Sequence, residues 1–224
     1  MISKRGRENS LTGLKLKLII FDLDGTLVNS YPAIICSVNS TLGKLNLRKQ
    51  SQRAIRRAVG WGDKALLLPF VGNKRIKLAL QFYRKHHKRS LRQKATFMPG
   101  AKRLLNYLHK KGYKLAIASN RPSRFSDILL RHLKIKRLFS YVLCKDQIRF
   151  GKPHPSILNK IIQKLKVNKQ GVLYVGDMAI DVCTGRRAKI KTFAVTTGSS
   201  SLIELKREKP DFISKDLSRL FREL

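Results

Sequence analysis

The stretch Phe-Asp-Leu-Asp-Gly-Thr-Leu-Val-Asn at residues 21–29 decides the fold that we expect for this chain. It follows a basic, apolar run from Leu14 to Ile20, which predicts a buried strand that ends in a glycine loop. Residues two apart in an extended segment point the same way, so Asp22 and Asp24 can face one pocket. Two like charges held this close are unfavourable unless a cation or a phosphoryl group lies between them. The chain has only 13 acidic residues against 49 basic ones, so the pair indicates chemistry more than two solvated acids in a turn.

Beyond residue 98, strand-like and helix-like patterns alternate along the chain. Strands are expected at 114–118, 141–144, 172–175 and 192–195, with helices between them. Such alternation predicts right-handed crossovers and a mostly parallel sheet. Ligands of these sheets bind beyond the carboxyl ends of the strands. Polar motifs stand at or near such ends, namely Ala-Ile-Ala-Ser-Asn at 116–120, Gly-Lys-Pro-His-Pro at 151–155 and Val-Gly-Asp-Met-Ala-Ile-Asp at 175–181.

The segment from Tyr31 to about Ala95 breaks this alternation. Helical spacing is expected over residues 31–45, 50–59, 63–70 and 74–90. Gly60, Gly62 and Gly72 interrupt these helices. A helical insertion is therefore expected directly after the first motif.

In this order, the four motifs resemble those of the haloacid dehalogenase superfamily of phosphohydrolases. The details Asn120-Arg121-Pro122 and Thr197-Gly198 are closest to its phosphoglycolate phosphatase-like branch, and the similarity runs from about Leu16 to Leu220. The resemblance implies an α/β fold with a Rossmann-like, mostly parallel sheet core and an inserted α-helical cap domain. The core would comprise residues 1–27 and 97–224, and the cap residues 28–96.

The resemblance also assigns the catalytic aspartates. Hydrolysis of a phosphomonoester needs an in-line nucleophile, a cation on the phosphoryl oxygens and an acid for the leaving oxygen. By its place in the motif, Asp22 would be the nucleophile that forms an aspartyl-phosphate. Asp24 would protonate the leaving alkoxide and later take a proton from the attacking water. Its presence argues against the dehalogenases of the superfamily, which lack the second aspartate.

Oxygen ligands and a phosphate substrate indicate Mg²⁺ as the cofactor. The ligands implied by the resemblance are Asp22, the backbone carbonyl of Asp24, and Asp177. Asp181 lies one helical turn after Asp177 and could face the ion directly or through water. The alternative for Asp177 is that it caps the following helix, which is compatible with metal binding.

Phosphate and substrate contacts are expected from four further residues. Ser119 would donate a hydrogen bond to the phosphoryl group, although a serine after a strand is more often a turn or cap residue. Lys152 would neutralise the nucleophile and the phosphate, a role that only the surrounding motif distinguishes among 49 basic residues. The resemblance adds Asn120 and Thr26 to this set, and Thr26 after Gly25 favours hydrolysis.

Three functions remain open at this point. The first is a Mg²⁺-dependent phosphomonoester hydrolase that acts on a small phosphorylated, phosphoglycolate-like metabolite. The second is a sugar-phosphate mutase of the β-phosphoglucomutase type. The third is a basic protein of the same fold that binds nucleic acid with little turnover. The complete set of Asp22, Asp24, Lys152 and Asp177 argues against the third.

Composition bears on partners and compartment. The formal charge of +36 favours anionic partners such as a phosphomonoester, but we interpret most of it as compositional bias, so nucleic-acid binding would be weak and non-specific. Three cysteines without CxxC spacing indicate a reducing, cytoplasmic compartment. No apolar run approaches the ~20 residues that span a bilayer, so no membrane partner is expected. Residues 4–7 are interpreted as a short disordered lead.

Overall fold

The computed structural model describes residue 13 and residues 15–224. The expected N-terminal lead, and Leu14 at the start of the first expected strand, lie outside the described residues. The described chain is built on a six-stranded sheet in the order β5-β4-β1-β6-β7-β8. All of its adjacent strands pair in parallel. The strands are β1 (Leu18–Phe21), β4 (Lys114–Ser119), β5 (Tyr141–Cys144), β6 (Val172–Gly176), β7 (Lys191–Val195) and β8 (Phe212–Ser214).

Helices cover both faces of the sheet because its strands are apolar on both sides. Ile19 and Phe21 of β1 belong to the buried cluster that α4, α5 and α9 close. Leu18 and Ile20 face the opposite cluster, which is packed under α6. The helices of this layer structure are α4 (Ala101–Lys110), α5 (Ser123–His132), α6 (Ser156–Leu165), α7 (Ala179–Ala188), α8 (Leu202–Arg207) and α9 (Ser218–Glu223). The predicted α/β class with a mostly parallel sheet is confirmed.

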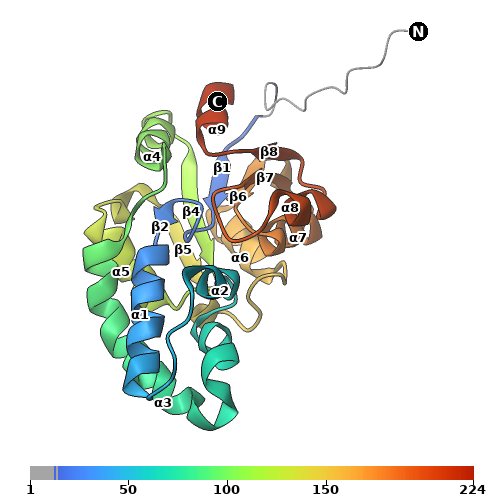
Figure 1. Cartoon of the computed structure of the whole chain (residues 1–224). Helices are drawn as coiled ribbons and strands as arrows, with labels where there is room; N and C mark the ends of the chain where they lie inside the picture. Colours follow the sequence, from blue (N-terminus) through green and yellow to red (C-terminus); the bar gives the residue numbers. More distant parts are fainter. Residues whose placement is uncertain (1–12, 14) are drawn as a thin grey trace.

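Three further helices gather beyond one end of the sheet (Figure 1). They are α1 (Tyr31–Lys44), α2 (Gln52–Arg57) and α3 (Asp63–Lys94), which share a separate cluster of buried apolar side chains. A two-stranded antiparallel ribbon, β2 (Val28–Asn29) with β3 (Thr96–Phe97), connects them to the sheet. We retain the division into core and cap at residues 28 and 96 as a proposal.

Helix α3 is the longest element, with 32 residues. Its backbone leaves the helical region at Gly72, where φ is 68°, so it turns at the interruption that the sequence predicts. No helix among the described residues is long and apolar enough to cross a membrane.

Candidate active site

The site lies at the carboxyl ends of the three adjacent central strands. Asp22 follows β1, Ser119 ends β4 and Asp177 follows β6. The later strands lie on both sides of β1, with β4 and β5 on one side and β6, β7 and β8 on the other. The carboxyl ends of the central strands therefore form the crevice at which ligands of such sheets bind. A cavity opens there between the sheet and the helices above it. Its lining residues are Asp22, Asp24, Ser119, Asn120, Arg121, Lys152 and Met178 from the expected core, and Ile34, Val59, Gly60, Gly62, Asp63, Leu66 and Tyr83 from the expected cap.

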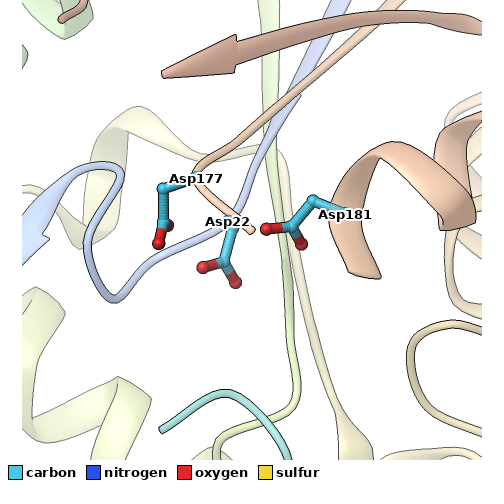
Figure 2. Close-up of side chains that lie close together, drawn as sticks. All are labelled: Asp22, Asp177 and Asp181. Carbon is cyan, nitrogen blue, oxygen red and sulfur yellow. The ribbon is translucent and has the colours of Figure 1, made fainter. Parts of the chain in front are cut away.

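Asp22, which lines the cavity, is one of three buried carboxylates that lie close together. Asp22, Asp177 and Asp181 each offer an oxygen, and these oxygens lie within 4.8 Å of one another. Figure 2 shows the three side chains turned toward one another, with Asp181 projecting from α7. Both Asp181 oxygens already accept hydrogen bonds, from the Tyr174 hydroxyl at 2.7 Å and the Met178 N–H at 3.0 Å.

The electrostatics of this cluster suit the binding of a cation. The pKa of Asp22 is raised to about 7, chiefly by burial; Lys152 opposes this rise, whereas Asp181 and Asp24 add to it. Burial and the two neighbouring carboxylates raise the pKa of Asp177 well above its usual range. Its Oδ2 atom is buried and has no hydrogen-bond partner among the described residues. An orphaned carboxylate oxygen beside two further carboxylates is a suitable oxygen donor set for Mg²⁺.

A glycine at 198 keeps the space around this orphaned oxygen open. A Cβ atom there would lie 1.5 Å from Asp177 Oδ2, and one on Gly25 would lie 2.6 Å from it. Gly25 also has a φ of 87°, which favours glycine. Both positions therefore need glycine for the loops to approach the carboxylate.

Lys152 is the basic partner of Asp22 and Asp181. Its Nζ atom donates to Asp22 Oδ1 at 2.6 Å and to Asp181 Oδ1 at 2.7 Å. Although burial lowers the pKa of Lys152, Asp181 and Asp22 together raise it above its usual value. The lysine thus carries its charge into a buried position, where it fixes one oxygen of Asp22.

Asp24 is held by a different cation. Arg121 donates from Nε to Asp24 Oδ2 at 2.7 Å and from Nη2 to Oδ1 at 2.6 Å, and the Ser30 hydroxyl also donates to Oδ1. The third arm of the guanidinium, Nη1, lies 3.0 Å from His87 Nε2 on α3. The sequence argument required one cation or phosphoryl group between Asp22 and Asp24. Instead, each aspartate has a basic partner of its own.

The residues expected to contact phosphate differ in their access to the cavity. Ser119 lines the cavity, and its Oγ accepts the Arg121 N–H at 3.2 Å. Asn120 also lines the cavity, but its carboxamide connects two backbone segments. It donates to the Gly60 and Lys152 carbonyls, both at 3.0 Å, and accepts the Lys152 N–H at 2.9 Å. The substrate-binding roles of both residues stay predictions.

Thr26 lies behind the cavity wall. Its hydroxyl donates to Asp177 Oδ1 at 2.6 Å, and its side chain is fully buried. This contact orients the Asp177 carboxylate, so that Oδ2 is the oxygen left without a partner. A direct contact between Thr26 and phosphate stays a prediction without support from this geometry.

Two contacts close the cap segment over the core. Gly60 approaches Met178 so closely that a Cβ there would lie 2.4 Å from the Met178 sulfur. On the other side, Arg57 of α2 makes a two-pronged ion pair with Glu204 of α8, with both N···O distances 3.0 Å. The loop between α2 and α3 therefore lies directly above the carboxylate cluster.

Sequence reasoning missed the residues that surround Asp24. Arg121 entered it only as a detail of the second motif, and Ser30, Asp63 and His87 were not singled out as site residues. One available signal was the position of Arg121 two residues after the strand-ending Ser119. Any basic residue in that loop is placed at the edge of the sheet where the ligands bind.

Comparisons with known proteins agree with this geometry. The family model for haloacid dehalogenase-like hydrolases matches residues 19–195. A phosphoglycolate phosphatase of Haemophilus influenzae is 32% identical over 92% of this chain and 97% of its own length. One of Pseudomonas fluorescens is 30% identical over 95% of this chain and 81% of its own. The crystal structure of a predicted phosphoglycolate phosphatase from Haemophilus somnus superposes with a TM-score of 0.89 at 28% identity, covering 93% of this chain and 97% of that one.

Proposed function

This chain belongs to the haloacid dehalogenase-like hydrolases and is a phosphatase of their phosphoglycolate phosphatase-like kind. On this basis we propose that it hydrolyses a small phosphorylated metabolite, phosphoglycolate or a close analogue, with Mg²⁺ and through an aspartyl-phosphate on Asp22. One observation carries the proposal. Asp22 lies at the floor of a cavity between a buried lysine, 2.6 Å away, and two carboxylates that offer a metal site. The cytoplasm remains the proposed compartment.

The first half of the reaction forms the intermediate. An oxygen of Asp22 attacks phosphorus, and the bond from phosphorus to the ester oxygen breaks. Lys152 holds Asp22 Oδ1 and balances the negative charge of the transferred group, while the Ser119 hydroxyl can donate to a phosphoryl oxygen. Asp24 gives its proton to the leaving alkoxide. The alcohol then departs, and the aspartyl-phosphate remains.

The second half regenerates the enzyme. Asp24, now ionised, takes a proton from a water molecule that attacks phosphorus. The bond between phosphorus and the Asp22 oxygen breaks. Inorganic phosphate is released, and the Asp22 carboxylate is restored. The same residue therefore acts first as acid and then as base.

Bound Mg²⁺ would supply positive charge for the phosphoryl oxygens and for the crowded carboxylates. Asp22 and Asp177 are proposed to hold it through side-chain oxygens, together with the backbone carbonyl of Asp24. Asp181 is proposed to act through water, since Lys152, Tyr174 and the Met178 N–H already occupy its two oxygens. The orphaned Asp177 oxygen supports a direct contact for that residue.

No specific observation favours the mutase or the nucleic-acid binder. The charge of the cap segment is partly used within the molecule. Arg57 pairs with Glu204, and the Arg56 guanidinium lies 4.0 Å from the centre of the Tyr31 ring. Arg57 thus joins the cap segment to α8, and Arg56 packs within the cap segment, so both arginines have a structural role that needs no polyanionic partner.

Phosphate release from a panel of phosphomonoesters tests the proposal. We expect turnover of small metabolites that depends on Mg²⁺, disappears with a chelator and returns when Mg²⁺ is restored. Double-stranded DNA and RNA serve as binding controls, and their affinity should fall steeply with salt because it comes from counterion release. A protein that releases no phosphate from any ester with Mg²⁺, Mn²⁺ or Co²⁺ would refute the proposed function.

A further inference from the structure

Among the described residues that line the cavity, Lys152 and Arg121 are the two basic side chains. Lys152 serves Asp22 and Asp181, as expected for the end that binds the transferred phosphoryl group. Arg121 is buried, and it pairs with the aspartate that is expected to protonate the leaving group. The catalytic scheme above uses Lys152 but leaves Arg121 without a role.

The contact of Arg121 with Asp24 prevents Asp24 from acting as a general acid. Asp24 accepts three hydrogen bonds, two from the guanidinium fork and one from Ser30. A carboxylate that receives donors on both oxygens is an acceptor only, whereas an acid must carry a proton on one of them and direct it at the ester oxygen. Arg121 therefore has to leave Asp24, at least in part, before the leaving group can be protonated.

His87 holds the fork in place without neutralising it. Burial, with Arg121 adding to it, lowers the pKa of His87 well below its usual range, so the ring is uncharged. Its Nε2 must then accept from Arg121 Nη1, and the ring proton resides on Nδ1, 3.0 Å from the Ser37 hydroxyl oxygen. The ring stacks on Tyr83 with centroids 4.6 Å apart. A neutral partner thus holds the guanidinium beside the cavity without cancelling its charge, which Asp24 and, more weakly, Asp63 balance.

The position of the fork defines which anion fits. The ester oxygen has to come within about 2.6–3.2 Å of Asp24 to receive its proton. The Arg121 nitrogens lie 2.6 and 2.7 Å from the same carboxylate. A carboxylate one carbon away from the ester oxygen therefore falls within reach of the fork. Planar carboxylates match the two parallel N–H groups of arginine better than they match a lysine.

We propose that Arg121 selects substrates with a carboxylate beside the phosphoester, and that this carboxylate takes the guanidinium from Asp24 and so frees Asp24 to act as acid and base. The inference rests on the proposed function and names its substrate class. Phosphate esters without the carboxylate leave the fork on Asp24, and they are turned over slowly even where they fit the cavity.

Two esters with the same two-carbon skeleton separate this role from others, 2-phosphoglycolate and 2-hydroxyethyl phosphate. For the native chain we expect kcat/KM to favour phosphoglycolate by ~10²-fold or more, because only this ester takes the guanidinium from Asp24 and frees that residue to act as acid and base. Arg121→Met should lower kcat/KM for phosphoglycolate by a much larger factor than that for hydroxyethyl phosphate, and so bring the preference below about tenfold. Arg121→Lys should lie between them. Arg131→Met, an exposed arginine of α5, should keep the native preference.

The possible outcomes of this comparison test the inference and the proposed function separately. A native chain that hydrolyses both esters equally well contradicts the inference, even if the Arg121 variants fail to fold. Equal losses for both esters in Arg121→Met, with the preference preserved, would reduce Arg121 to a structural clamp and also contradict it. Failure of the native chain to release phosphate from any ester is different, since it refutes the proposed function itself.

A second measurement uses only the native chain. Methyl phosphate lacks the carboxylate, and added formate can supply one separately. We expect formate to accelerate methyl phosphate hydrolysis at fixed ionic strength, with chloride as the control anion. Inhibition or no effect at concentrations up to those that alter protein stability would count against the exchange of partners.

Discussion

The two halves of the active site are built from different parts of the molecule. On the nucleophile side, Asp22, Lys152 and Asp181 all come from loops and a helix at the ends of the parallel strands. On the leaving-group side, Asp24 is held by Arg121, which in turn contacts His87 of the long helix α3. The nucleophile side is therefore complete within the sheet, whereas the leaving-group side depends on how the cap segment sits on it. In the proposed mechanism, this difference separates the residues that carry out the chemistry from those that choose the substrate.

The largest expected effect concerns the nucleophile side. Asp22→Asn should reduce kcat on the order of 10⁴-fold or more, since the amide cannot form the phosphorylated intermediate. Folding should be preserved because asparagine has nearly the same shape and removes a carboxylate that burial disfavours. Phosphate release and thermal unfolding check both statements. Asp127→Asn, on the exposed surface of α5, is the matched control. Equal turnover by Asp22→Asn and the native chain would remove Asp22 from the mechanism.

The second largest effect concerns the leaving-group side alone. Asp24→Asn should lower kcat by about 10²–10⁴-fold for alkyl phosphates, the usual contribution of a general acid. The loss should be smallest for p-nitrophenyl phosphate, whose leaving group needs little protonation. Kinetics with a series of phenyl phosphates measure this dependence. A uniform loss across the series would assign Asp24 a structural function instead.

An intermediate effect concerns the metal. Asp177→Ala should raise the Mg²⁺ concentration needed for activity by removing the buried oxygen that lacks a partner. Without Mg²⁺ the variant should unfold at the same or a slightly higher temperature. Relief of carboxylate burial and repulsion offsets the lost hydrogen bond from Thr26. Unfolding of Asp177→Ala under all conditions would favour a capping function for this residue.

The metal prediction has a defined pH dependence. The pKa of Asp22 rises from 3.8 to about 7 on folding without a cation, so the folded state binds more protons than the unfolded one between these values. Its contribution to stability is therefore present below pH 4 and lost as the pH rises through about 7. Since Mg²⁺ competes with these protons, the increase in Tm caused by Mg²⁺ should grow from pH 5 to pH 8. A constant increase, or one retained by Asp177→Ala, would contradict this metal site.

The smallest expected effect concerns closure of the cap segment. Arg57→Ala should lower kcat/KM by roughly two- to five-fold at low salt, because an exposed ion pair contributes little. The effect should shrink as salt rises. Glu204→Gln should give a similar loss, and the double variant should lose no more than either single one. Arg53→Ala, on the same helix and also exposed, is the control. Additive losses at all salt concentrations would show that the two residues act separately.

The positions of the residues on the proposed nucleophile side were predictable for a physical reason. Ser119 ends a strand, and Asp22 and Asp177 each follow one. The apolar character of these strands is local, and parallel strands bring their carboxyl ends together. The interruption at Gly72 was likewise visible because glycine breaks a helical pattern. By contrast, β8 and α8 have only three and six residues, too few for a periodic signal.

The leaving-group side could not be predicted in the same way. Arg121 resembles the 48 other basic residues until the fold buries it against Asp24. His87 lies 34 positions away in sequence, on a helix whose rotation decides which side chains face the cavity. Thr26 reaches Asp177 across 151 positions. Such contacts depend on tertiary packing, for which a single sequence offers no local pattern.

Direct detection of the phosphorylated residue tests the central claim, that the phosphoryl group passes through Asp22. The enzyme is mixed with substrate and Mg²⁺, quenched in acid within milliseconds, digested and analysed by mass spectrometry. The account predicts one acid-stable, hydroxylamine-sensitive phosphate on Asp22, which is absent from Asp22→Asn. A phosphate on another side chain, or rapid turnover during which no phosphorylated protein is detected at any time, would contradict it.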